Sequence, residues 1–75
     1  MINLKLSTPT GVSIEEEVSQ VEIKMVEGNA TILSDHIPFI SLIKNGYVKY
    51  NQEQIDVQKG IVHFDKNNMY ITYFE

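Results

Sequence analysis

Two histidines, His36 and His63, are the only side chains in this sequence whose unperturbed pKa lies near neutrality. His36 follows Asp35 in a segment expected to form a loop, where a metal-binding or acid–base role is conceivable. A zinc site would need further ligands at suitable spacing, and the sequence contains no cysteine. His63 lies in an expected strand, with Asp65 two residues later on the same face. We therefore predict a loop hydrogen bond for His36 and a solvent-facing strand position for His63.

The consecutive glutamates Glu15, Glu16 and Glu17 could be read as a cation site. On an extended chain, however, neighbouring side chains point to opposite faces, so these carboxylates would not converge on one ion. A solvated edge or turn is the favoured interpretation, because charge there also discourages edge-to-edge pairing. No serine stands in a Gly-x-Ser-x-Gly elbow, and four scattered glycines do not form a phosphate-binding loop. We predict no catalytic residue, no metal site and no cofactor.

Size and charge narrow the class of protein. The 75 residues suffice for one domain, residues 1–75. Six lysines and no arginine stand against ten acids, and the net charge of -4 argues against nucleic acid and against an anionic membrane surface. A hydrophobic fraction of 43% is too high for a disordered chain. No apolar run reaches the roughly 18 residues of a membrane span, and the start is unlike a signal peptide, so we expect a cytosolic location.

The composition favours strands over helices. Isoleucine, valine and aromatic residues are abundant, whereas alanine occurs once, at Ala30. The one helix-like stretch, residues 14–18, is short and could equally be a turn. Period-two alternation predicts strands near residues 2–6, 12–14, 21–25, 30–33, 39–43, 47–50, 55–57, 61–64 and 69–74. Turn residues between them predict turns at 8–11, 27–29, 34–36, 44–46, 51–54, 59–60 and 65–68.

This spacing predicts an all-β fold of about 8 to 10 short strands, either a small barrel or an antiparallel β-sandwich of two sheets. The run from Phe39 to Ile43 is continuously apolar apart from Ser41, and we expect it to be buried on both faces. A small β module without catalytic groups that leaves an apolar face exposed is typical of a binding or interaction domain.

An ordered set of motifs points to a family. A Thr-Pro-Thr-Gly turn at residues 8–11 precedes Glu27-Gly28 and an Ile-Leu-Ser-Asp-His-Ile-Pro segment at 32–38. Lys44 and Gly46 follow, and Gly60 precedes a further strand. This set resembles the N-terminal β-sandwich domain of the epsilon subunit of F-type ATP synthase, over essentially the whole chain. Departures from the family pattern, such as Ser34-Asp35 where proline-glycine is usual and Lys59 where glycine is usual, indicate a divergent member.

The resemblance implies a non-catalytic subunit of the central stalk, the rotor of an F-type or F-type-like rotary ATPase. Such a subunit docks on the gamma subunit, near alpha and beta catalytic subunits and a membrane c-ring, and helps couple rotation and proton transport to ATP synthesis or hydrolysis. The implied location is cytoplasmic and peripheral on the inner face of the cell membrane through the complex. Family members usually continue into a C-terminal helical hairpin. The sequence given ends at Glu75, before such a hairpin, so its inhibitory and ATP-binding roles do not carry over if this is the whole protein.

The resemblance also implies two contact sites. The gamma-type partner is expected to meet His36, Ile37, Pro38, Phe39 and Ser41. Because Ile37 and Phe39 share parity, both could point outward and leave Ile40 and Leu42 inward, although all four could also lie in the core. The turn Glu27-Gly28-Asn29 is expected to face the c-ring, with an ordinary solvated turn as the alternative. A free β-sandwich adaptor that binds a peptide or a small ligand is the alternative to the rotor subunit as a whole.

Overall fold

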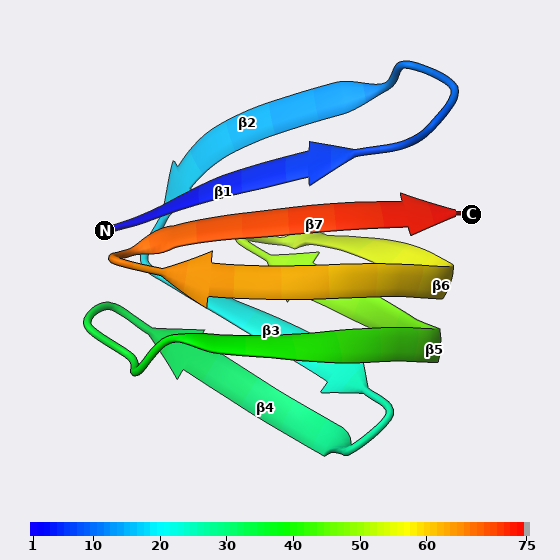
Figure 1. Ribbon diagram of the computed structural model, residues 1–75. Helices are drawn as coiled ribbons and strands as arrows, with labels where there is room; N and C mark the ends of the chain where they lie inside the picture. The colour runs from blue at the N-terminus through cyan, green and yellow to red at the C-terminus, as the bar shows by residue number, and fades with distance from the viewer. Residues whose placement is uncertain (75) are drawn as a thin grey trace.

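The computed structural model describes residues 1–74, which form seven strands and contain no helix. The strands are β1 (Ile2–Ser7), β2 (Ser13–Val18), β3 (Gln20–Met25), β4 (Gly28–Leu33), β5 (Phe39–Tyr50), β6 (Glu53–Asp65) and β7 (Asn68–Phe74). They hydrogen-bond in the order β2-β1-β7-β6-β5-β3-β4, with β1 and β7 parallel and every other pair antiparallel (Figure 1). The all-β prediction is confirmed, but the expected count of strands is too high.

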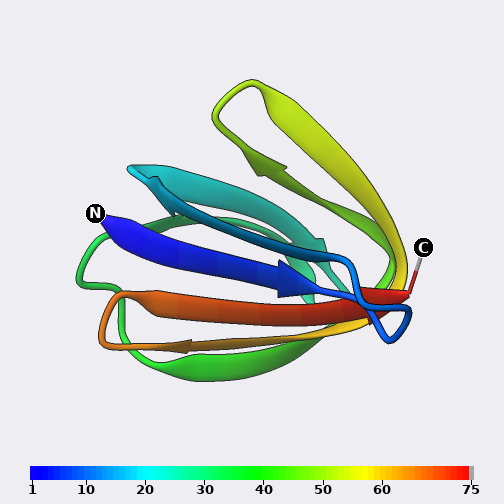
Figure 2. The ribbon, with the colours of Figure 1, turned by 90° about the horizontal axis from the view of Figure 1, so that it is seen from above.

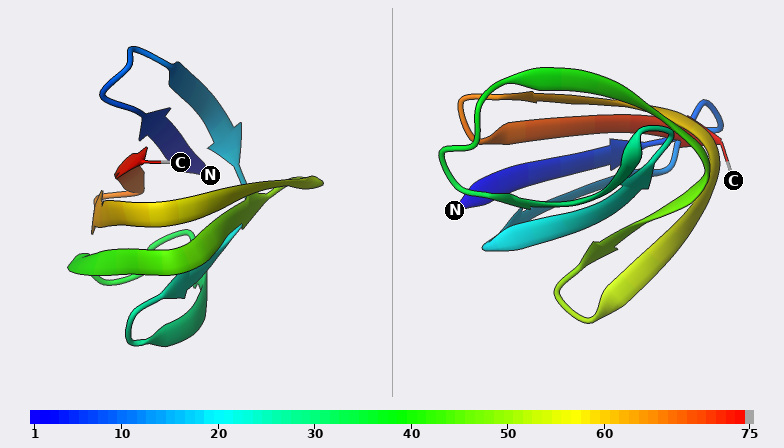
Figure 3. Two further views of the ribbon diagram at one scale, coloured as in Figure 1. Left: turned by 90° about the vertical axis from the view of Figure 1, so that its right-hand side faces the viewer. Right: turned by 90° about the horizontal axis from the view of Figure 1, so that it is seen from below.

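One continuous sheet supplies both layers of the sandwich, because the long hairpin β5–β6 belongs to each of them. The first half of β5 pairs with the last part of β6, which in turn pairs with β7. The second half of β5 pairs with the first part of β6 on one side and with β3 on the other. Figures 2 and 3 show the hairpin curving from one layer into the other. The expected pair of separate sheets is therefore replaced by a single sheet folded over itself.

The core lies between the two layers. It consists of the inward-facing residues, which alternate with outward-facing ones along the strands. In β1 the three residues Ile2, Leu4 and Leu6 are all buried, and the residues between them are half-buried. Across the core, Val21 and Ile23 of β3 are fully buried. The β-branched residues that led to the strand prediction thus fill the pleated inner surface, where their stiff side chains pack well.

Two expected turns are bends inside long strands. The sequence predicts turns at residues 44–46, which contain asparagine and glycine, and at residues 59–60, which contain glycine. These two segments lie within β5 and β6 instead. A Cβ on Gly46 would lie 2.1 Å from the carbonyl oxygen of Lys24, and one on Gly60 would lie 3.0 Å from that of Thr72. Asn45 has a φ of 52°, in the left-handed region. Glycine is needed here because backbones approach closely where the hairpin changes layer, and not because the chain reverses.

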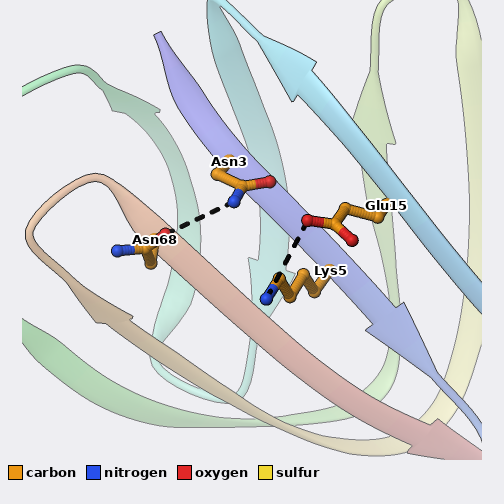
Figure 4. A network of polar contacts seen from close by, with 4 residues as sticks. All are labelled: Asn3, Lys5, Glu15 and Asn68. Carbon is orange, nitrogen blue, oxygen red and sulfur yellow. Dashed lines mark hydrogen bonds and ion pairs between the residues drawn. The ribbon is translucent and has the colours of Figure 1, made fainter.

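The glutamate run forms the edge strand β2, so the prediction of a solvated edge is confirmed and the helix alternative is wrong. Glu15 and Glu17 are exposed, whereas Val18 at the end of the strand is buried. Lys5 Nζ lies 3.9 Å from Glu15 across the β1–β2 pair (Figure 4). On the other side of β1, Asn3 donates a hydrogen bond of 3.5 Å to Asn68 of β7. These two contacts link β1 to its neighbours on either side, and the carboxylates of β2 do not converge on one ion.

Candidate docking face

The loop between β4 and β5 presents His36, Ile37 and Pro38 to solvent, and all three side chains are exposed. His36 Nδ1 lies 2.7 Å from the carbonyl oxygen of Ile37, which confirms the predicted loop hydrogen bond. The imidazole also meets Phe39 edge-on, with ring centroids 5.3 Å apart. The histidine is therefore a fixed part of the loop surface. His63 is exposed on β6, which confirms its predicted solvent-facing position.

A pair of reciprocal hydrogen bonds clamps this loop to the β6–β7 turn. The backbone N–H of Asp35 donates to Asn67 Oδ1 at 2.6 Å, and Asn67 Nδ2 donates to Asp35 Oδ1 at 3.1 Å. Both residues have positive φ, 65° for Asp35 and 61° for Asn67, a conformation that Asn and Asp tolerate better than most residues. The clamp joins segments 32 positions apart in the sequence and fixes the place of His36.

The expected orientation of β5 is reversed. Phe39 is half-buried, packs against the core and stacks on Phe64 with ring centroids 5.9 Å apart. Ser41 is only 8% exposed, while Ile40 and Leu42 are 70% and 56% exposed. The alternation does not extend from Ile37 into β5, because Ile37 lies in the loop and the strand begins at Phe39. The expectation that the run from residue 39 to 43 is buried on both faces is also wrong.

The reversed parity creates an apolar surface that the sequence did not reveal. Large apolar side chains point outward from β5, β6 and β7, and one more follows β3. We call this set the outer apolar face, and it comprises Val26, Ile40, Leu42, Ile61 and Phe74. Leu42 pairs directly with Ile61, and the Leu42 carbonyl accepts a hydrogen bond of 2.9 Å from Val26 N–H. A groove of about 310 Å³ runs along Val26, Leu42, Ile61 and Phe74.

Sequence reasoning assigned no surface role to Val26, Ile61 or Phe74. Outward and inward apolar residues of a strand look alike in a sequence, and only the register of neighbouring strands separates them. The one available signal was the excess of apolar residues in β6 and β7. Ile61-Val62 and Tyr70-Ile71 are adjacent apolar pairs, which a strand with one solvated face would not need.

The turn expected to face the c-ring lies beside this surface. Glu27, Gly28 and Asn29 are all exposed, and Gly28 opens β4 with a φ of 132° that favours glycine. Glu27 Oε1 accepts a hydrogen bond of 3.0 Å from Ser41 Oγ, so the turn is tied to β5. Ser41 is therefore buried beneath the turn, with its hydroxyl hydrogen-bonded to Glu27.

The opposite layer carries the two tyrosines with a shifted pKa. Tyr47 donates a hydrogen bond to Glu22, and this bond to the carboxylate, together with burial, raises the pKa of Tyr47. Burial raises the pKa of Tyr50. Residues 1–74 hold no group of three or more His, Asp or Glu side chains placed to bind a metal ion. The same residues contain no helix of the length and apolarity that spanning a membrane requires.

The fold and its motifs coincide with a known family. The family described as the beta-sandwich domain of the ATP synthase delta/epsilon chain matches residues 1–73. The chain belongs to this family. An ATP synthase epsilon chain from Ureaplasma urealyticum is 40% identical across the whole chain, and the match covers 61% of that relative. An epsilon chain from Pelagibacter ubique is 37% identical over 59 residues, which cover 73% of this chain and 45% of that one.

Solved structures agree with the family assignment at the level of fold. A chain in a structure of the Euglena gracilis mitochondrial ATP synthase superposes with a TM-score of 0.85 at 21% identity, over 99% of this chain and 51% of that one. A chain in the central stalk and c-ring of the Tetrahymena thermophila enzyme gives 0.75 at 14% identity. This epsilon-family chain spans only about half to three-fifths of the length of the relatives it matches.

Proposed function

We propose that this chain acts as a non-catalytic rotor subunit in the central stalk of an F-type or F-type-like rotary ATPase. The outer apolar face is the observation that carries the proposal. Its five members are each at least half exposed, and they are contiguous with the exposed loop at 36–38. An apolar patch on a small β domain marks a surface that another protein covers, because burying it removes apolar area from water.

The partner we propose for this face is a gamma-like subunit of the central stalk. Family membership supports this choice, as does the combination of an apolar surface with a rigid loop. Ile40 and Leu42 would supply apolar contacts, whereas His36, Ile37 and Pro38 would form the rim. Phe39 and Ser41, which were expected to touch the partner, would act from beneath as supports for the loop and the turn.

A rotor must transmit torque without yielding, and the fold suits that task. Each layer is hydrogen-bonded along its length, and the β5–β6 hairpin carries strain directly from one layer to the other. Interdigitated side chains between the layers make the interior stiff. In the assembled complex the chain would lie near alpha- and beta-type catalytic subunits, on the cytoplasmic side and peripheral to the membrane.

The turn at Glu27, Gly28 and Asn29 is the proposed contact with a membrane c-ring. Its exposure and its hydrogen bond to Ser41 support the proposal, because the turn is accessible to a partner and is held against β5. Charge reversal at Glu27 should weaken coupling of proton flow to ATP synthesis in membrane vesicles. Unchanged coupling in the Glu27→Lys variant would remove this turn from the interface.

Two leucines of equal exposure allow a matched test of the docking proposal. Leu42 of the outer apolar face is 56% exposed and Leu33 of β4, in the other layer, is 55% exposed. Binding of a purified gamma-type subunit from the same cell should fall by at least roughly 100-fold for Leu42→Asp, as at an interface hot spot. It should be unchanged for Leu33→Asp, and both variants should unfold at similar denaturant concentration. Loss of binding in the Leu33→Asp variant alone would refute the proposed face.

A free-standing adaptor is the second candidate, and the edge strand β4 favours it. Residues 28–33 carry no charge, unlike the three glutamates on the opposite edge strand β2. An uncharged edge could accept an added peptide strand. If a tagged chain purified from its native cell brings no ATPase-like subunits with it, the adaptor function replaces the rotor function.

A further inference from the structure

Two lysines stand side by side at the end of the groove in the outer apolar face. Lys44 of β5 and Lys59 of β6 are direct partners in the antiparallel register, and both side chains are exposed. Directly opposed residues in such a pair have Cβ atoms about 5 Å apart, so like charges there are destabilising. Within residues 1–74, no carboxylate lies within 4.0 Å of either ammonium group. Among the described residues, no carboxylate offsets the repulsion between the two ammonium groups.

The composition does not explain the pair, since the chain has ten acids and six lysines. Its acidic cluster lies on β2, which is separated from β6 by β1 and β7 in the sheet. Lys59 also pairs with Phe74 on its other side, which places an ammonium group next to the apolar groove. The two lysines line that groove together with Leu42 and Ile61. A second, open hollow of about 590 Å³ adjoins it and is also lined by both lysines.

We infer that the partner surface covering the outer apolar face has an apolar centre and at least one aspartate or glutamate placed opposite Lys44 and Lys59. This inference rests on the proposed docking function and specifies the chemistry of the partner. A carboxylate between the two ammonium groups would relieve their repulsion, so the pair stabilises the complex and not the free domain. The aliphatic stems of the lysines would extend the apolar contact while their charged ends form its rim.

Charge complementarity of this kind acts mainly on association rate and orientation. A paired positive rim draws an acidic rim toward the groove, and it disfavours a rotated complex in which the lysines meet a neutral or basic surface. Because the lysines are exposed, salt should screen the attraction strongly. The inference therefore predicts a salt-dependent component of binding that the apolar residues alone would not produce.

The test uses two double variants that change the charge equally. Lys44→Gln/Lys59→Gln removes the proposed rim, whereas Lys24→Gln/Lys49→Gln removes two exposed lysines from the other layer. Association of each variant with the purified gamma-type subunit is measured from low to high salt. At low salt we expect the first variant to associate roughly tenfold more slowly and to lose most of its salt dependence. The second variant should behave like the unaltered chain.

Further variants separate this inference from the docking proposal. Lys44→Glu/Lys59→Glu should bind still more weakly, and a lysine introduced at the facing acid of the partner should restore binding. If Leu42→Asp abolishes binding while both glutamine variants bind like the unaltered chain at every salt concentration, the inference is wrong and the docking face stands. If neither Leu42→Asp nor the lysine variants alter binding, the docking proposal itself fails. Unfolding curves should show Lys44→Gln/Lys59→Gln to be at least as stable as the unaltered chain.

Discussion

The hairpin β5–β6 has a different surface on each side of its bend. Before the bend in β5, the outward residues Ile40 and Leu42 are apolar, and Ile61 of β6 faces the same way. Beyond the bend, the outward residues include Lys49 of β5 and Asp56 of β6, which are charged and exposed. In both layers, these two strands bury their inner face. Their outer face is apolar in one layer only, and it is charged in the other. Folding alone does not require that difference, and we therefore propose that a partner covers the first layer.

Gly46 lies at the bend between the two layers, and a substitution there is expected to have the largest effect on stability. A Cβ there would overlap the carbonyl oxygen of Lys24, and backbone cannot move aside cheaply. We expect Gly46→Ala to lower the free energy of unfolding by at least about 3 kcal/mol, a large share of the stability of a domain this small. Urea denaturation measures the loss. Gly60→Ala, with its nearest contact at 3.0 Å, should cost less, and equal costs would contradict the close-approach explanation.

Phe39 tests which side of β5 faces the core. Because its ring packs against Phe64, Phe39→Asp should lower the free energy of unfolding by roughly 2 kcal/mol through burial of a charge. Ile40→Asp, at a side chain that is 70% exposed, should change stability by less than about 0.5 kcal/mol and should reduce partner binding instead. A stable Phe39→Asp domain would mean that the outward parity expected from the sequence is right after all.

Asn67 tests whether the docking loop must be held in place. Asn67→Gly keeps the positive φ but removes both hydrogen bonds to Asp35, so we expect a loss of about 1 kcal/mol in unfolding free energy. Faster amide exchange at residues 35–37 and weaker binding of the gamma-type subunit should accompany it. Lys66→Gly, at a neighbouring residue with positive φ, is the control and should leave loop exchange unchanged.

The smallest expected effect lies in the polar layer. The pKa of Tyr47 is raised by its hydrogen bond to Glu22, so the folded state keeps the phenol proton to higher pH than the unfolded chain does. The resulting stability is fully present below about pH 10 and is lost as pH rises through the raised pKa. Alkaline unfolding curves of Tyr47→Phe should decline less steeply than those of the unaltered chain. Parallel curves would mean that the bond to Glu22 is not maintained in solution.

The sequence predicted the class of fold because alternation and β-branched composition are local signals. It failed at residues 44–46 and 59–60, since glycine marks both a chain reversal and a close backbone approach. It failed for Phe39 and Leu42 because strand parity depends on where a strand begins, and Pro38 places that start after the loop. The loop residues at 36–38 are exposed, and their contact with a partner stays a prediction from the family resemblance. The outer apolar face and the Lys44–Lys59 pair arise from the register between neighbouring strands, which no single segment encodes.

Hydrogen exchange of the chain with and without a gamma-type subunit tests the central claim most directly. We expect protection on binding in the loop at 36–38, in the first half of β5, and in the parts of β6 and β7 that contain Ile61 and Phe74. The strands β3 and β4 of the opposite layer should exchange at unchanged rates. Protection confined to β4 and the second half of β5, with none around Leu42 and Ile61, would contradict the account.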